Sequence, residues 1–180
     1  ETLHAPRLLP ESGRLTALAC AVCTLGPALE TRIGTLFAER RASLAMALDA
    51  LGNELLMAIS RRAQDRMLVD ARRRGLTMAG ELRAGDPGLA LDAQASVLRL
   101  AQSELIGVRL AGGQLMHPLK SVSMVLGVGV GLLGNGVLEH GLAGAEGPGM
   151  KPVPPSAIGL KVSMARTPVI ITREGRGFSV

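Results

Sequence analysis

The hydrophobic and polar positions along the chain fall into periods that predict strands alternating with helices. Residues 15–24 form a continuous apolar run of strand length, which predicts a buried strand. Gly26 and Pro27 end this run, and proline suits the first position of a helix. Glu30 falls in the first turn of that helix, where a carboxylate interacts favourably with the helix dipole. After a polar lead of residues 1–13, the chain is therefore expected to form a strand and then a helix.

A long helix is predicted over residues 43–74, because apolar residues recur there at helical spacing. The recurring positions are Leu44, Leu48, Leu51, Leu55 and Ala58. Asp49 and Gly52 interrupt this face, and a glycine inside a helix costs about 1 kcal/mol relative to alanine. We therefore expect another element to pack closely against Gly52. Gly75 follows the helix as a suitable C-cap.

Beyond the long helix the pattern predicts shorter elements. The pair Gly112-Gly113 between two apolar runs is typical of a hairpin turn. Strands are predicted over residues 78–83, 106–110, 115–130, 158–163 and 169–172, and a second helix over residues 91–104. Glycine and proline dominate residues 131–155, and the chain ends in a glycine-rich tail that we expect to be flexible. We interpret residues 1–130 as the core, and 131–180 as a connection and closing strands of the same domain.

Composition narrows the classes of function. Hydrophobic residues make up 47% of the 180 residues, which is enough for one domain with an aliphatic core. The chain has no Trp and no Tyr, and its two Phe residues are Phe37 and Phe178. This argues against single-stranded nucleic acid as a partner, because its recognition uses aromatic platforms. The net charge of +5 leaves duplex binding open on charge alone, but we expect no nucleic acid partner.

The apolar runs do not predict a membrane protein. The first ten residues lack the apolar block of a signal peptide. The longest apolar run, residues 122–138, is shorter than a spanning helix requires and is interrupted by glycine, serine and asparagine. We therefore expect a soluble, cytoplasmic protein with no membrane partner.

The two cysteines, Cys20 and Cys23, have the spacing of a CxxC motif. A metal site normally needs a second pair of ligands, and a redox pair should lie at the start of a helix. Here both lie inside a predicted strand, where a spacing of three puts the side chains on opposite faces. We interpret them as inert thiols of the core.

Three further patterns have a structural and a functional interpretation. Arginines cluster along the long helix at positions 61, 62, 66 and 72–74, either as a solvated face or as a docking face for an acidic partner. Residues 129–134 match GxGxxG, but no convincing helix follows, and glycines that bend a buried strand explain the match better than a dinucleotide site. The histidines have no metal-ligand spacing, so no metal site is expected.

Two segments stand out as candidate ligand contacts. Arg83 leads into a loop that contains Pro87 and Gly88, where a ligand can come close to a backbone without a side chain. An arginine there can pair with a carboxylate. Lys120 and Ser121, with Ser123 close by, open a buried strand, an unusual place for polar groups. The alternative interpretation is that Arg83 is a solvated charge and that Lys120 reaches solvent along its apolar stem.

The order of several short motifs resembles a known family. The motifs run through residues 23–30, residues 48–52, Arg83 with Pro87-Gly88, Gln94, residues 106–110 and residues 116–123. This succession, over roughly residues 14–127, is similar to the activation (reactivation) domain of cobalamin-dependent methionine synthase, in its stand-alone form. The resemblance implies an α+β fold with a twisted antiparallel β-sheet and flanking helices.

The resemblance also implies a function. The family domain binds S-adenosylmethionine and presents its methyl group to a corrinoid (cobalamin) held by a partner, while an electron donor such as a flavodoxin allows remethylation. Arg83 and Gly88 match the family's ligand loop, so Arg83 would hold the methionine carboxylate, and Pro87 and Gly88 would lie against the ligand. Lys120 and Ser121 match a further family segment. The loop here is one residue longer, and Leu89 stands where the family has tyrosine.

Two functions follow from the resemblance. The first is an S-adenosylmethionine-binding accessory protein for reductive reactivation or methylation of a corrinoid methyltransferase of the methionine synthase type. The alternative is a non-catalytic subunit with this fold that docks on a corrinoid protein or methyltransferase without binding S-adenosylmethionine. No catalytic acid–base pair is predicted for either function.

Overall fold

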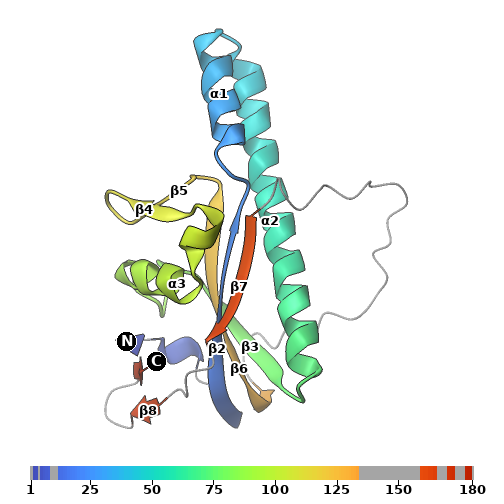
Figure 1. Ribbon diagram of the computed structural model, residues 1–180, viewed down its shortest axis with the longest axis vertical. Helices are drawn as coiled ribbons and strands as arrows, with labels where there is room; N and C mark the ends of the chain where they lie inside the picture. Colours follow the sequence, from blue (N-terminus) through green and yellow to red (C-terminus); the bar gives the residue numbers. More distant parts are fainter. Residues whose placement is uncertain are drawn as a thin grey trace, which may run out of the picture.

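The computed structural model describes residues 2–3, 5–8, 12–133, 159–165, 170–172 and 177–179. Its centre is a four-stranded antiparallel sheet with the strand order β3-β6-β2-β7 (Figure 1). The strands of this sheet are β2 (Ser12–Thr24), β3 (Thr77–Leu82), β6 (Ser121–Leu133) and β7 (Gly159–Ala165). The predicted α+β class is confirmed at the level of helices packed on a small antiparallel sheet.

Two smaller sheets flank the central one. The first is a hairpin of β4 (Arg109–Ala111) and β5 (Leu115–His117). The second has the order β1-β9-β8 and brings the chain ends together, with strands β1 (Thr2–Leu3), β8 (Ile170–Thr172) and β9 (Gly177–Ser179). The tail that we expected to be flexible therefore contributes a paired strand, which the sequence pattern missed.

Helices cover the two faces of the central sheet. The α-helices are α1 (Ala28–Ala38), α2 (Ala42–Arg72) and α3 (Gln94–Leu100), and short 3₁₀ helices are η1 (Pro6–Leu8), η2 (Leu91–Ala93) and η3 (Ser103–Ile106). The lower part of α2 runs along one face of the sheet, and α3 lies on the other side (Figure 1). The upper part of α2 pairs with α1 in a hairpin that extends beyond the sheet.

The core divides into two main clusters, one on each face of the sheet. Alternate residues of β2 belong to different clusters, because successive strand side chains point to opposite faces. Cys20 lies with Val97 and Leu98 of α3, whereas Cys23 lies with Ala63 and Met67 of α2. The prediction that the two thiols occupy opposite faces and are buried is confirmed.

Several predicted elements are confirmed with small shifts of their ends. The first strand begins at Ser12, before the expected start at residue 15, and the long helix spans Ala42–Arg72. Gly75 has a positive φ of 70°, as a helix C-cap requires. The close packing expected at Gly52 is also present, since a Cβ there would lie 2.7 Å from Leu29 Cδ2. The connection predicted over residues 131–155 starts too early, because β6 continues to Leu133. The rest of it, residues 134–155, lies outside the described residues.

The predicted helix over residues 91–104 is wrong, because the chain forms η2, α3 and η3 instead. Gln102 adopts a left-handed conformation with φ of 53°, which ends α3. The Ser103 hydroxyl donates to the Val108 carbonyl at 2.9 Å, and such side-chain bonds compete with a continuing helix. Ile106 therefore belongs to η3, and the following strand starts only at Arg109.

The predicted single strand over residues 115–130 is two strands. Pro118 has no N–H to continue the ladder, and residues 118–120 turn the chain between β5 and β6. The first strand completes the hairpin across Gly112-Gly113, which confirms the predicted turn. The second strand, β6, crosses to the central sheet, where it pairs with β2 and β3.

Candidate functional site

A shallow groove lies at the open edge of β6. The ladder between β3 and β6 ends at the pair Leu82–Val125, so residues 121–124 have β2 on one side and no strand of the described chain on the other. A cavity of about 290 Å³ opens at this edge. Its lining includes Arg83, Leu91, Gln94, Leu115, Leu119 and Ser123. The loop after β3, the helix α3 and the β4–β5 hairpin thus meet the start of β6 at one site.

The loop after β3 is held by its own hydrogen bonds. The backbone N–H of Arg83 donates to Asp86 Oδ2 at 2.8 Å, and the N–H of Gly85 donates to the Leu89 carbonyl at 2.9 Å. Leu89 is buried in the core and anchors the end of the loop. Gly88 has a φ of 102°, which favours glycine, and a Cβ there would come within 2.9 Å of the Arg7 side chain. Gly88 therefore allows the N-terminal segment to approach the loop.

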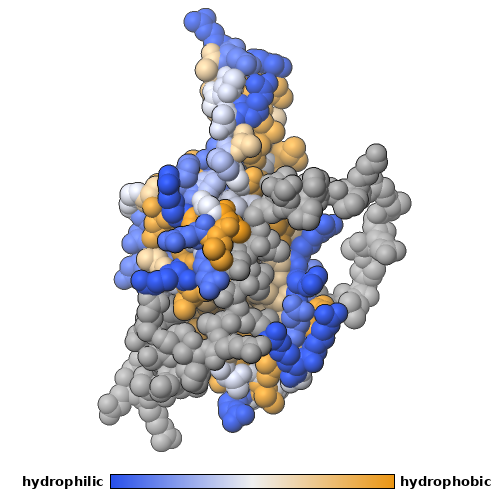
Figure 2. All heavy atoms as spheres, viewed as in Figure 1, coloured by the Kyte–Doolittle hydropathy of each residue, from blue (hydrophilic) through white to orange (hydrophobic). Residues whose placement is uncertain are grey.

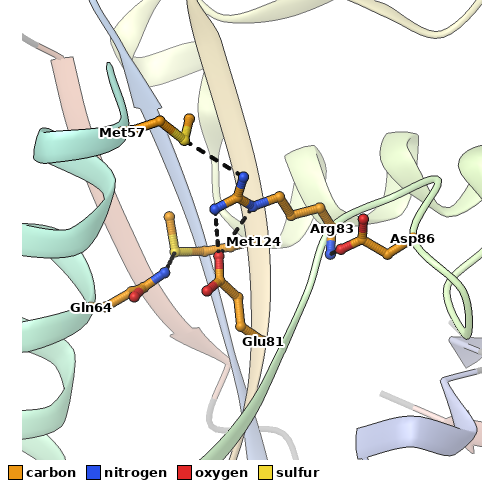
Figure 3. A network of polar contacts seen from close by, with 6 residues as sticks. All are labelled: Met57, Gln64, Glu81, Arg83, Asp86 and Met124. Carbon is orange, nitrogen blue, oxygen red and sulfur yellow. Dashed lines mark hydrogen bonds and ion pairs between the residues drawn. The ribbon is translucent and has the colours of Figure 1, made fainter. Parts of the chain in front are cut away.

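Arg83 carries the cation of the groove. Its Nε and Nη2 donate to Glu81 Oε1 at 3.1 and 2.8 Å, and Nη1 approaches Met57 Sδ at 3.7 Å (Figure 3). Glu81 thus orients the guanidinium toward α2, while the Arg83 side chain stays 37% exposed. Beside it, Gln64 of α2 donates to the sulfur of Met124 at 3.6 Å. The site therefore offers a partly paired, accessible arginine next to an apolar surface.

Neutral polar groups lie deeper in the same groove. Gln94 and Ser123 are almost fully buried, and the Ser123 hydroxyl donates to Gln94 Oε1 at 3.4 Å. Gln114 Oε1 is buried and accepts no hydrogen bond within the described part of the chain. Buried polar atoms normally have partners, so the Gln114 amide oxygen indicates a place where a ligand or water binds.

Lys120 lies outside the groove lining and joins three elements. Its Nζ lies 2.7 Å from Asp49 Oδ1 and donates to Asn53 Oδ1 at 2.6 Å, both on α2. Its backbone N–H donates to Glu30 of α1 at 3.1 Å, and its carbonyl accepts the Leu25 N–H at 3.0 Å. The ammonium, the backbone N–H and the carbonyl of Lys120, just before the buried strand β6, therefore each have a partner within the fold. Glu30 has this tertiary contact in addition to its place in the first turn of α1.

Ser121 is also engaged inside the fold. Its hydroxyl lies 2.6 Å from the Pro118 carbonyl and 2.8 Å from Thr24 Oγ1. The five predicted ligand contacts are therefore not brought together. Arg83 lines the groove, Pro87 is exposed on the loop, Gly88 packs against Arg7, and Lys120 and Ser121 connect strands and helices.

The sequence indicated only some of the residues that line the groove with Arg83. Gln94 stood in the motif order that carries the resemblance, and Ser123 stood in the polar segment before the buried strand. Leu91, Leu115 and Leu119 are between 50% and 63% exposed, and their part in the apolar rim follows only from the tertiary structure.

The two thiols have the properties of inert core groups. Burial raises the pKa of Cys20 to about 12. Burial likewise raises the pKa of Cys23 to about 12, with a smaller opposing effect of the positive Arg83. At neutral pH such thiols hold almost no thiolate, which is the nucleophilic and metal-binding form. Among the described residues, no group of three or more His, Cys, Asp or Glu is placed to hold a metal ion.

The glycines of the GxGxxG match bring strands together. A Cβ on Gly129 would overlap the Arg14 carbonyl of β2, and the β2–β6 register shifts beside it. Gly131 has a φ of 59°, and Gly134 lies outside the described residues. Gly129 therefore allows β2 to approach β6 closely, and Gly131 adopts a φ that favours glycine. That these glycines bend the strand stays a prediction.

One helix of the described chain, α2, is long and apolar enough to cross a membrane by length and composition alone. This is weak evidence, because core helices of soluble proteins meet the same criteria, although only 17% of the apolar window is buried here. Cytoplasmic location and the absence of a membrane partner stay predictions. No family model matched the sequence, and no curated protein matched it either.

Proposed function

We propose that this protein binds S-adenosylmethionine and assists the reductive reactivation or methylation of a corrinoid methyltransferase, as an activation domain of the methionine synthase type does. The motif order along the chain supports this proposal, together with an α+β fold. The observation that carries it is the groove at the edge of β6, where Arg83 lies beside Gln94 and Ser123 within an apolar rim. The specific activation-domain fold is part of the proposal.

The chemistry of the groove suits the parts of this ligand. The Arg83 guanidinium would hold the ligand carboxylate, since arginine pairs with carboxylates through two N–H groups. The Gln94 amide and the unpartnered Gln114 Oε1 would bond hydroxyl or amino groups. Leu91, Leu115 and Leu119 would cover apolar portions. Pockets for ligands of this size hold about 300–1,000 Å³, so a groove of about 290 Å³ would leave part of the ligand exposed.

An exposed ligand suits a protein that acts on a partner. The sulfonium already activates the methyl group, so this chain would contribute positioning rather than acid–base chemistry. The corrinoid would lie on the partner protein, and an electron donor would reduce it. The exposed leucines of the groove rim, Leu115 and Leu119, would then lie at the contact with that partner.

A second candidate function rests on a specific observation. Arg83 already pairs with Glu81, and Leu89 is buried in the core where the family has tyrosine at this place in the loop. A protein that docks on a corrinoid protein or methyltransferase without binding S-adenosylmethionine would retain these features. The two functions differ in whether the groove takes up the ligand.

Titration calorimetry with S-adenosylmethionine distinguishes them. We expect micromolar binding that weakens at least tenfold in Arg83→Ala, because the carboxylate loses its charged partner. Arg32→Ala is the matched control, since Arg32 is an exposed arginine of α1 paired with Glu39 at 3.5 Å. Lys120→Met should leave the affinity unchanged if Lys120 acts only within the fold. No heat at millimolar ligand would refute the first function and favour the second.

A further inference from the structure

One face of α2 is exposed along nearly its whole length. We call this face the docking face, and its residues are Leu44, Leu51, Leu55, Ala58, Arg62, Arg66, Val69 and Arg73. Successive members are three, four or seven residues apart, and such spacings place side chains on one side of a helix. Each of these side chains is exposed. The face is apolar toward the tip of the α1–α2 hairpin and basic toward the end of α2.

The apolar half of the docking face has no cover within the described chain. Leu51 is 63% exposed, and Leu44 and Leu55 are 44% and 40% exposed. α1 packs on a different side of α2, where Ile33 and Leu36 meet Ala45. Figure 2 shows the resulting hydrophobic surface on the α2 side of the projecting hairpin. Single exposed leucines are common, but a row of them on a projecting helix marks an interaction surface.

The basic half of the docking face continues the same line. Residues 61–74 contain six arginines and two aspartates, and Figure 2 shows this part of α2 as hydrophilic. Arg66 and Arg73 share Asp70 at 3.8 and 3.6 Å, which are weak exposed contacts. Arg62 forms no ion pair with any described residue. The positive charge of this half is therefore available to an acidic partner.

The spacing of the apolar half indicates what kind of element it fits. Leu44, Leu51, Leu55 and Ala58 are separated by seven, four and three residues. Leu48 fills the remaining heptad position and is half-buried against the cluster shared with α1. This is the heptad spacing with which helices pack side by side in coiled coils. A partner helix with leucines at matching positions would insert them between these side chains.

Charge decides against a second copy of this chain and against a membrane. Antiparallel copies in full overlap would lay the arginines of one against the leucines of the other, and parallel copies would bring the arginines together. A staggered pair that overlaps only through the apolar halves would leave the arginines without an acidic partner. A helix lying on a membrane has its apolar and basic residues on opposite sides, whereas here they follow one another along one side. The hairpin tip also ends in the exposed charged residues Glu39, Arg40 and Arg41.

We propose that the docking face binds an amphipathic helix of a partner protein, apolar over one half and acidic over the other. The apolar halves pack as a short heptad seam, and the acidic half meets Arg62, Arg66 and Arg73. This proposal deepens the docking role that both candidate functions include. It does not require S-adenosylmethionine in the groove, because the docking face is made of α2 residues that do not line the groove.

A designed peptide tests the docking face directly. The probe is a synthetic helix with leucines at heptad positions in one half and glutamates on the same face in the other, made in both orders to allow parallel and antiparallel binding. Fluorescence anisotropy of the labelled peptide should show saturable binding of one order. We expect Leu51→Glu to weaken it at least tenfold, and the double variant Arg62→Glu, Arg66→Glu to weaken it similarly and to remove most of its salt dependence.

The controls separate this proposal from general stickiness and from unfolding. Arg32→Glu reverses one arginine on α1, away from the docking face, and should leave binding within about twofold. A peptide with lysines in place of the glutamates should not bind. Circular dichroism should show that each variant is folded, and Leu51→Ala serves as the milder substitution if Leu51→Glu is not. Binding of neither peptide, or equal binding of the lysine peptide, would overturn the proposal.

Two other occupants of the docking face, a second copy of this chain and a membrane, would be recognised by separate measurements. A dimer in sedimentation equilibrium that Leu51→Glu abolishes would assign the face to a second copy and overturn the proposal. Co-sedimentation with vesicles of anionic phospholipid that Leu51→Glu abolishes would assign it to a membrane, with the same consequence. S-adenosylmethionine titration of the Leu51→Glu variant should match the unmodified protein, so the groove and the docking face can fail independently.

Discussion

The two halves of helix α2 differ in a way that hydrophobicity alone does not explain. Residues 42–59, the tip half, are the more apolar, yet within them only Ala45, Gly52 and Leu56 are buried. Residues 60–72, the base half, carry most of the charges but bury Ser60, Ala63, Gln64, Met67, Leu68 and Ala71. The base half lies on the central sheet (Figure 1). The tip half packs mainly on the narrow helix α1 and reaches the sheet side only near Leu56 and Lys120. Burial therefore follows the width of the surface that faces the helix.

The largest expected effect is at the contact of the base half with the sheet. Met67 is fully buried among the residues of the cluster that includes Cys23 and Met124. Met67→Ala should lower the free energy of unfolding by about 3 kcal/mol, because it removes buried methylenes and leaves a cavity. Urea denaturation followed by circular dichroism measures this. A loss below about 1 kcal/mol would mean that the base half is not packed as described.

A change of pH tests the same cluster through Cys23. Its thiol has an ordinary pKa of 9.0 and a pKa of about 12 in the folded chain, chiefly through burial. The folded state therefore holds this proton more tightly, so stability that is complete below pH 9 is lost as the pH rises toward 12. The loss is about 1.4 kcal/mol per pH unit for one thiol, or about 2 kcal/mol near pH 10.5.

Comparing variants isolates this contribution from other titrating groups. Urea denaturation at pH 7.5 and at about pH 10.5 should show a smaller loss of stability in Cys23→Ala than in the unmodified protein. The chain has no tyrosine to confuse the comparison. Equal pH dependence of both proteins would show that Cys23 is accessible to solvent.

Gly52 lies where the tip half meets α1 and Lys120. A Cβ there would be 2.7 Å from Leu29 Cδ2 and 3.5 Å from Lys120 Cε. Gly52→Val should cost about 1–2 kcal/mol, since overpacking outweighs the gain in helix propensity. Ala50→Val, on an exposed position of the same half, is the matched control and should change stability by less than about 0.5 kcal/mol. Equal effects at the two positions would contradict the close approach of α1.

Ser60, the first residue of the base half, offers a stabilising change. Its hydroxyl is buried and has no hydrogen-bond partner among the described residues. Ser60→Ala should raise the free energy of unfolding by about 1 kcal/mol, because it removes an unsatisfied polar group and favours the helix. A destabilisation of that size would reveal a partner for the hydroxyl.

The smallest effect on stability is expected at Leu51, in the middle of the apolar half of the docking face. Leu51→Ala should change the free energy of unfolding by less than about 0.5 kcal/mol, because the side chain is 63% exposed. The contrast with Met67→Ala is the sharpest test of the comparison between the two halves. A loss of 2 kcal/mol at Leu51 would show that another part of the chain covers it.

Sequence patterns predicted the long elements better than the short ones. The first strand is a continuous apolar run of strand length, and the apolar residues of the long helix repeat at helical spacing over many residues, so the type of each element was clear. The helix predicted over residues 91–104 failed because Gln102 turns left-handed and Ser103 bonds to Val108, neither of which the apolar period records. The single strand predicted over residues 115–130 was wrong, because the chain turns at Pro118. Proline is a strong signal for such a break, but the prediction followed the continuous apolar pattern instead.

The candidate site was predicted only in part. Arg83 was expected at a ligand site and lines the groove, while Lys120 and Ser121 prove to be engaged with α2, α1 and β2. The sequence shows that a lysine before a buried strand needs a partner, but not whether that partner is a ligand or Asp49. The answer depends on α2, which lies far from Lys120 in the sequence and close to it in the fold.

By itself, the sequence determined the local structure of the long elements. It determined the aliphatic core, the opposite faces of Cys20 and Cys23, and the glycine at which another element approaches α2. Only the tertiary structure decided which apolar residues are buried. Leu44, Leu51 and Leu55 have the same period as a core face but are between 40% and 63% exposed. Period is a property of neighbouring residues in one helix, whereas burial needs a second surface that distant parts of the chain must supply.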